Sequence, residues 1–274
     1  MTVPDNASAA VAGCVAAYVA RERVRPLFRS AFARRRGRLV IARSAAELNR
    51  VVRRELVDAV VVDVGAPTDE TWASAALARE LPGVPFFSYG PVGPDDAPAL
   101  ARCAGLGFAD LLAEPIDDGA LAALVAPHRF STRFARALAE PPCMLRLATP
   151  LQLRAWQYVV AHAGRAVSTA EVAAKARVTR EHLSRSFTAG GAPNLKRVMD
   201  LVRVIAAAEL AKNPGYAVRD VATILGFASS SHLASTARRV VGTRPSSLAR
   251  LRTMDLLERF AALTGDRVRV SEEV

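Results

Sequence analysis

The sequence predicts two folds in one chain: an α/β half that contains a doubly wound parallel sheet, and an all-α half of seven helices. Residues 1–126 alternate between short β-branched runs and longer stretches with helical spacing, which is typical of βα repeats. After a proline-containing segment at residues 127–149, apolar residues recur only at helical spacing. The length of 274 residues leaves room for two domains of ordinary size.

Five short apolar runs predict the strands of the first half. The clearest, residues 58–64, is an almost unbroken series of β-branched and small apolar residues, as expected for a parallel strand that is buried on both faces. The predicted strands are residues 13–19, 38–42, 58–64, 84–88 and 108–112.

A helix is predicted after each strand. Residues 45–56 give the clearest start signal, because Ser44 is a favourable N-cap and Glu47 follows three residues later. Pro26 is expected near the true start of the first helix. The predicted helices are residues 21–35, 45–56, 71–81, 95–105 and 117–125. Short connections between alternating strands and helices favour the doubly wound parallel sheet.

Prolines mark the boundary between the halves. Residues 127–149 are predicted to be a linker with one short helix at 131–139, because prolines interrupt regular elements and stiffen linkers. Beyond it, Ser168 and Glu171 form a capping box, and Thr179 is placed to cap the following helix. The seven predicted helices are residues 151–163, 168–176, 180–187, 194–212, 218–225, 229–240 and 246–260.

Two pairs of these helices have the pattern of a helix-turn-helix. The first pair meets at a turn over residues 177–178, and the second pair meets at Gly226 and Phe227. Two short helices across a tight turn form a unit whose second helix enters the major groove of DNA. The sequence therefore predicts double-stranded DNA as a partner.

The charge distribution favours the same partner. The formal net charge of the chain is +11. Residues 144–253 hold 17 Lys and Arg against 5 Asp and Glu, a net of +12, whereas residues 1–143 hold 17 against 16. Basic charge that is confined to one domain indicates a binder of polyanions.

The helical half resembles the DNA-binding domain of the AraC/XylS family of transcriptional regulators. The resemblance rests on the segment from Thr179 to Phe187, on Arg203 and the alanines that follow it, on Gly226-Phe227, and on the segment from Gly242 to Pro245. It covers residues 150–250 and leaves residues 251–274 as a C-terminal helix and tail. It implies a sequence-specific regulator whose two recognition helices lie in adjacent segments of the major groove.

The resemblance also implies which side chains face DNA. Arg185 is the best reader, because arginine pairs with guanine through two hydrogen bonds, but a phosphate contact or a structural ion pair is the alternative. Glu181 accepts from cytosine or pairs with Arg185 one helical turn away. The implied base contacts are Arg180, Glu181, Ser184, Arg185, Ser230, Ser231 and Ser235, and the implied phosphate contacts are Lys196, Arg197, Arg238, Arg239 and Arg244.

The first half resembles a response-regulator receiver domain, which has a flavodoxin-like sheet. Asp63 ends the third predicted strand, at the family's phosphoacceptor position, and Ser88 matches its Ser or Thr at the end of strand four. The family's acidic pair after strand one is replaced by Arg21 and Glu22, and its lysine by Glu114. Because phosphoryl transfer needs a neutralising cation, Asp63 is predicted to be inactive and to cap a loop instead.

The remaining expectations concern chemistry and location. The three cysteines are far apart, and no spacing suits a metal site, so no cofactor or metal is expected and the chain is not predicted to be an enzyme. No signal peptide or membrane span is predicted, which favours the cytoplasm. A homodimer through the first domain and contact with RNA polymerase stay open. The alternatives are a response regulator that is phosphorylated on Asp63, and a protein-binding scaffold with a vestigial DNA-binding fold.

Overall fold

The chain folds into two compact units. The computed structural model describes the backbone of residues 13–33 and 38–272 and the side chains of 13–32 and 38–264. The first unit is Met1–Arg133 with Asn213–Tyr216, and the second is Phe134–Lys212 with Ala217–Val274. The division falls inside α6 (Phe130–Ala137). The domain boundaries at residues 126 and 150 stay predictions.

The first unit is built around a five-stranded parallel sheet. Its strands are β1 (Cys14–Tyr18), β2 (Arg38–Ala42), β3 (Val57–Asp63), β4 (Phe86–Pro91) and β5 (Asp110–Glu114). They are ordered β2-β1-β3-β4-β5, which is the flavodoxin-like order. All seven residues of the central strand β3 are buried, as its apolar sequence predicts. The predicted doubly wound sheet is confirmed.

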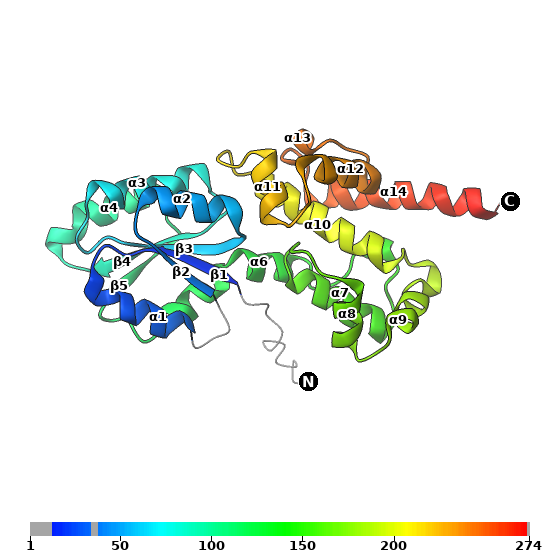
Figure 1. Ribbon diagram of the computed structural model, residues 1–274, viewed down its shortest axis with the longest axis horizontal. Helices are drawn as coiled ribbons and strands as arrows, with labels where there is room; N and C mark the ends of the chain where they lie inside the picture. The colour runs from blue at the N-terminus through cyan, green and yellow to red at the C-terminus, as the bar shows by residue number, and fades with distance from the viewer. Residues whose placement is uncertain (1–12, 34–37, 273–274) are drawn as a thin grey trace. The chain divides into compact units, whose positions relative to one another are not determined.

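Helices cover both faces of this sheet (Figure 1). On one face α1 (Arg25–Ala33) and α5 (Leu121–Val125) pack together over a core that includes Phe28, Val61 and Tyr89. On the other face lie α2 (Ala45–Arg54), α3 (Asp69–Glu80) and α4 (Ala97–Gly105). Ser44 caps α2 by accepting from the Glu47 N–H at 3.1 Å, as predicted. The Glu47 carboxylate accepts from the Arg43 N–H instead of closing the capping box on Ser44.

The last two strands start two residues later than predicted. Val84 donates its N–H to the Leu81 carbonyl at 3.0 Å, in a turn that directly follows the C-cap of α3. Phe108 likewise donates to the Cys103 carbonyl across Gly107, whose φ of 82° closes α4. Both segments therefore serve a helix C-terminus before the chain enters the sheet.

The second unit is helical. After α5 the chain forms a 3₁₀ turn, η4 (Ala126–His128), then α6 and a second 3₁₀ turn, η5 (Cys143–Leu145). The helices that follow are α7 (Pro150–Ala161), α8 (Thr169–Ala176), α9 (Arg180–Phe187), α10 (Leu195–Ala211), α11 (Val218–Ile224) and α12 (Ser230–Val241). The long helix α10 contacts α7, α11 and α12, and most of its residues are buried.

The predicted closing helix at residues 246–260 is wrong, because two helices occupy this segment. The first, α13 (Pro245–Leu248), ends where Leu251 donates its N–H to the Leu248 carbonyl. The second, α14 (Thr253–Glu272), begins where the Asp255 carboxylate accepts from the Arg252 N–H at 2.8 Å. This side-chain cap separates the two helices. Within the described residues, no helix is long and apolar enough to cross a membrane.

Candidate nucleic-acid interface and sheet-edge site

The first helix-turn-helix consists of α8 and α9. Helix α8 ends at Arg177, which takes the left-handed conformation with φ 57°, and Val178 donates its N–H to the Ala173 carbonyl. Thr179 then caps α9 by accepting from the His182 N–H at 3.2 Å. The backbone of the turn thus makes the hydrogen bonds that both helix ends need.

Helix α9 buries one face and exposes the other. Leu183 and Phe187 are fully buried, whereas the predicted base-contacting residues Arg180, Glu181, Ser184 and Arg185 are all exposed. Glu181 forms an ion pair with Arg180 at 3.5 Å, and not with Arg185 as one prediction had it. The Arg185 side chain has no ion-pair partner among the described residues. His182 is exposed as well.

A buried glutamine fixes the end of α9. Gln152 on α7 donates its amide to the carbonyls of Phe187 at 2.7 Å and Ala189 at 3.1 Å. Its own carbonyl accepts from the N–H groups of Ala148 and Thr149, both at 2.9 Å. One side chain therefore satisfies backbone groups at the start of α7 and at the end of α9. No pattern in the sequence indicates this role of Gln152, because it and Phe187 are 35 positions apart.

The second helix-turn-helix, formed by α11 and α12, repeats the backbone of the first. Gly226 takes the left-handed conformation with φ 67°, and Phe227 donates its N–H to the Ala222 carbonyl at 2.8 Å. Ser229 caps α12 by accepting from the His232 N–H at 3.1 Å.

The outward surface of α12 is made of short side chains. Ser231 and Ser235 are exposed, and Ser230 is half-buried. Ser235 donates its hydroxyl hydrogen to the His232 carbonyl at 3.0 Å. The His232 ring packs edge-on against Phe227, with 5.5 Å between the ring centroids. The predicted readers of this unit therefore offer few groups that reach outward.

Of the five predicted phosphate-contacting residues, two have no partner among the described residues and three contact other side chains of the unit. The side chains of Arg238 and Arg244 are exposed and have no hydrogen-bond or ion-pair partner among the described residues. Arg197, predicted to be exposed, is instead half-buried: it donates to Thr264 and lies over the Phe260 ring, which braces α10 against α14. The two remaining residues, Lys196 and Arg239, both pair with one buried aspartate, Asp200.

A half-buried arginine, Arg203, connects the long helix to the second turn. The Arg203 guanidinium lies 3.9 Å from the centroid of the Phe227 ring and donates to the Leu225 carbonyl at 3.0 Å. Burial lowers the pKa of Arg203. The sequence points to Arg203 by resemblance only. Its contacts explain the residue, because it satisfies the Leu225 carbonyl at the start of the turn between α11 and α12.

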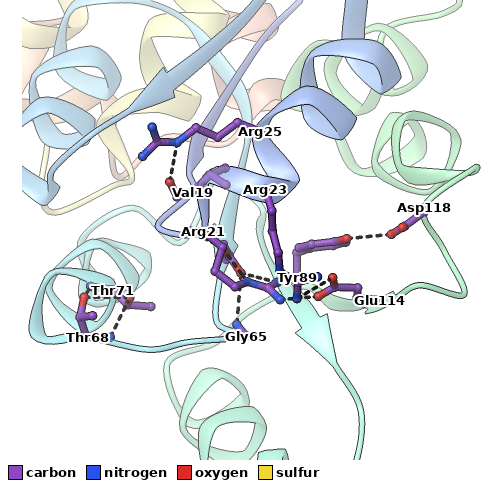
Figure 2. A network of polar contacts seen from close by, with 11 residues as sticks. Val19, Arg21, Arg23, Arg25, Gly65, Thr68, Thr71, Tyr89, Glu114 and Asp118 are labelled. Atoms are coloured by element: carbon purple, nitrogen blue, oxygen red, sulfur yellow. Dashed lines mark hydrogen bonds and ion pairs between the residues drawn. The ribbon is translucent and has the colours of Figure 1, made fainter.

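The first unit carries a charge cluster at the carboxyl ends of its strands (Figure 2). Asp63, at the end of β3, is fully buried. Its carboxylate accepts from the backbone N–H of Arg21 at 3.1 Å and from the Arg21 Nε at 2.8 Å, and the Arg21 Nη2 lies 2.6 Å from it. The Gly65 N–H also donates to it at 3.2 Å, so Asp63 does cap the loop after β3.

Arg21 bridges two carboxylates. Its Nη1 lies 2.5 Å from Glu114 at the end of β5, which also pairs with Arg23 at 3.3 Å. Only 9% of the Arg21 side chain is exposed. Burial opposes its charge, but the hydrogen bonds to Asp63 and Glu114 prevail and raise the pKa of Arg21. Glu22, the acid left at this place in the sequence, points elsewhere and pairs with Arg25.

Close packing fixes the guanidinium between Gly65 and Glu114 (Figure 2). A Cβ atom on Gly65 would lie 2.3 Å from the Arg21 Cζ, so only glycine leaves room for it. Arg21 thus supplies the positive charge beside Asp63 from within the chain.

The prediction that Ser88 ends strand four is wrong. Ser88 lies within β4 opposite Val62, and Tyr89 is the residue opposite Asp63. Since neighbouring residues of a strand point to opposite faces, Tyr89 takes the place beside the aspartate. Its hydroxyl donates to Asp118 at 2.8 Å, and burial together with this bond raises the pKa of Tyr89. No signal in the sequence identifies Tyr89, because the strand register decides its position.

Comparisons with known proteins agree with part of this description. A family model described as a helix-turn-helix domain matches residues 172–251, which confirms the predicted class of domain. Among solved structures, full-length FixJ from B. japonicum is similar over 88% of this chain and 100% of its own, at 14% identity and a TM-score of 0.37. At these values the similarity does not bear on function. No curated protein sequence matches significantly.

Proposed function

We propose that this protein is a DNA-binding transcriptional regulator of the AraC/XylS kind, in which α9 and α12 enter adjacent segments of the major groove. The observation that carries the proposal is the exposed face of α9, where Arg185 stands on a capped helix without an ion-pair partner among the described residues. The matched helix-turn-helix domain and the net charge of +12 over residues 144–253 support it.

The two units have different roles in this proposal. Arg185 reads a guanine, and Arg180, Glu181 and Ser184 flank that contact. Ser230, Ser231 and Ser235 are too short to discriminate strongly between bases, so the second unit sets register on the backbone. The phosphate contacts come from Lys196, Arg238, Arg239 and Arg244. Arg197 mainly holds α10 against α14, and its contact with a phosphate is secondary.

The test is a selection of bound fragments from a genomic library, followed by anisotropy titration of the best fragment. Arg185→Ala is expected to weaken binding about 10- to 100-fold and to relax the base preference at one position. Arg154→Ala is the matched control, because Arg154 is an exposed arginine of the same unit on α7. If Arg185→Ala behaves like Arg154→Ala, Arg185 is not the reader. If the wild-type chain selects no fragment, the scaffold alternative holds instead.

We propose further that the sheet unit works without phosphorylation. Phosphorylation of Asp63 needs a metal ion and space for the phosphoryl group beside the carboxylate. The Arg21 guanidinium occupies that space, because its Nη2 lies 2.6 Å from the Asp63 carboxylate. Glu114 adds a second negative charge that would repel an acyl phosphate.

Intact mass analysis after treatment with acetyl phosphate and Mg²⁺ tests this second proposal. The wild type is expected to stay unmodified. A phosphoryl adduct that is present in the wild type and absent in Asp63→Asn contradicts the proposal and restores the response-regulator alternative.

If the sheet unit is not phosphorylated, dimerisation is its remaining role. We therefore propose that a homodimer formed through residues 1–126 is the form that binds DNA. Sedimentation of the full chain tests it, because a monomer at micromolar concentration would refute the dimer. RNA polymerase is the expected downstream partner of such a regulator, to be tested by co-purification.

A further inference from the structure

A buried aspartate in the helical unit lies behind two of the predicted phosphate-contacting residues. Asp200 on α10 is almost fully buried, with 4% of its side chain exposed. One carboxylate oxygen accepts from the Arg239 Nη2 at 2.8 Å, and the other lies 3.8 Å from the Lys196 Nζ. Arg239 belongs to α12, the recognition helix of the second unit, so this contact spans 39 residues.

The two cations are not buried with the anion. The Arg239 side chain is 47% exposed and the Lys196 side chain is 68% exposed. A guanidinium carries five N–H donors, and the bond to Asp200 uses the Nη2 end only. Within the part of the chain that the structure describes, the other donors of the Arg239 guanidinium have no partner and stay available for a second acceptor. Two cations on one anion leave the group with a net positive charge.

We propose that Asp200 is a positioning residue that holds Arg239, and more loosely Lys196, for contact with one phosphate of the DNA backbone. The proposal rests on the function proposed above and explains how a recognition helix with serines on its outer face still holds DNA. An arginine loses rotamer freedom when it binds, and a partner that orients it beforehand removes part of that loss. Because Asp200 is fixed in α10 and Arg239 in α12, the packing of the two helices sets the direction of the guanidinium.

The alternative is an ion pair that only stabilises the fold, and the two interpretations predict opposite signs. Asp200→Asn keeps the shape of the side chain and raises the net charge of the chain by one. If charge alone governs affinity, the variant binds DNA more tightly. If Asp200 orients Arg239, the variant binds more weakly despite its more favourable charge. The matched control is Glu209→Gln, which makes the same charge change on the same helix, where Glu209 pairs with Lys212.

The experiment is an anisotropy titration of the full chain with a random-sequence DNA duplex at several salt concentrations, which needs no knowledge of the operator. Asp200→Asn is expected to bind about three- to tenfold more weakly than the wild type. Glu209→Gln is expected to bind as tightly as the wild type or more tightly. Arg239→Ala should lose binding to a similar extent and reduce the salt slope by about one. The double variant should be no weaker than Arg239→Ala alone, because Asp200 acts through Arg239.

Tighter binding by Asp200→Asn, or losses that add in the double variant, would overturn the positioning role. Should Asp200→Asn fail to fold, as judged by its circular dichroism, Arg239→Lys carries the test. Lysine keeps the charge but lacks the planar guanidinium that can bond Asp200 and a phosphate at once. Binding should therefore weaken severalfold while the salt slope stays unchanged. Binding equal to that of the wild type would refute the proposal. A wild type that binds no duplex at all refutes the proposed function, whereas a wild type that binds while Asp200→Asn binds more tightly refutes only the positioning role.

Discussion

The two helix-turn-helix units share a backbone and differ in almost everything that faces outward. In each unit a residue in the left-handed conformation ends the first helix. The next residue donates its N–H to the carbonyl five positions earlier, Val178 to Ala173 and Phe227 to Ala222. In each unit a hydroxyl caps the second helix. The outward faces then diverge, with charged side chains on α9 and serines on α12. The fold of such a unit is therefore set by its turn and caps, which leaves its surface free to specialise.

The units are also anchored by different chemistry. A neutral amide, that of Gln152, holds the end of α9, whereas a half-buried guanidinium, that of Arg203, holds the end of α11. The first anchor satisfies backbone groups on two helices, and the second adds contact with the Phe227 ring. Breaking one anchor should therefore disturb one unit and spare the other.

The largest expected effect comes from Gln152→Ala. It leaves buried backbone groups at both helix ends without partners, so the free energy of unfolding of the helical unit should fall by about 3 kcal/mol. Urea unfolding in a Trp72→Phe background measures this, because Trp156, the second of the two tryptophans, then reports alone. Gln157→Ala, an exposed neighbour on α7, is the control. A loss no larger than that of the control would show that Gln152 is not an anchor.

The next effect compares the outward faces. Loss of the Arg185 side chain should cost about 2 kcal/mol of discrimination between bound sequences, whereas Ser231→Ala should change the selected sequences hardly at all. Parallel selections from one randomised duplex library measure both. The comparison between the units breaks down if Ser231→Ala shifts the base preference more than Arg185→Ala does.

A smaller effect concerns the second turn. Gly226 has a positive φ, and a Cβ atom there would come no closer than 3.4 Å to Ala166, so space is available. Gly226→Ala should therefore lower the free energy of unfolding by about 1 kcal/mol through backbone conformation alone. Urea unfolding in the Trp72→Phe background checks this value. A loss above about 3 kcal/mol would point to a steric role instead.

The smallest effect has the opposite sign. Arg177 occupies the equivalent place in the first turn with φ 57°, a conformation that costs a non-glycine residue free energy. Arg177→Gly should raise the free energy of unfolding by about 0.5 kcal/mol, because relief of this strain slightly exceeds the entropy that glycine adds to the unfolded chain. Thermal unfolding of the two single variants, run side by side, is the measurement. A decrease would mean that the Arg177 side chain makes a contribution of its own.

Local features of both units could be predicted from the sequence. Ser168, Thr179 and Ser44 cap helices as predicted, because a cap depends on residues within one turn of the chain. The parallel sheet followed from the alternation of apolar runs. Arg21 was expected to oppose a divalent cation from its place after the first strand, but its ion pair with Asp63 was not predicted.

What could not be predicted depends on register and on contacts between distant residues. Tyr89 lies opposite Asp63 because of the register between β3 and β4. The strand β4 starts later than predicted, because the Val84 N–H is bonded to the Leu81 carbonyl. The pair of Asp200 with Arg239 requires the packing of α10 on α12. The break between α13 and α14 depends on one carboxylate cap that periodicity does not register.

The close approach of Arg21 to Gly65 has a consequence for the history of this chain. Any side chain at position 65 would displace the guanidinium from the carboxylates of Asp63 and Glu114, so arginine at position 21 requires glycine at position 65. Among homologous chains we expect these two positions to change together: chains with arginine at 21 retain glycine at 65, and chains with a shorter side chain at 21 are released from that constraint.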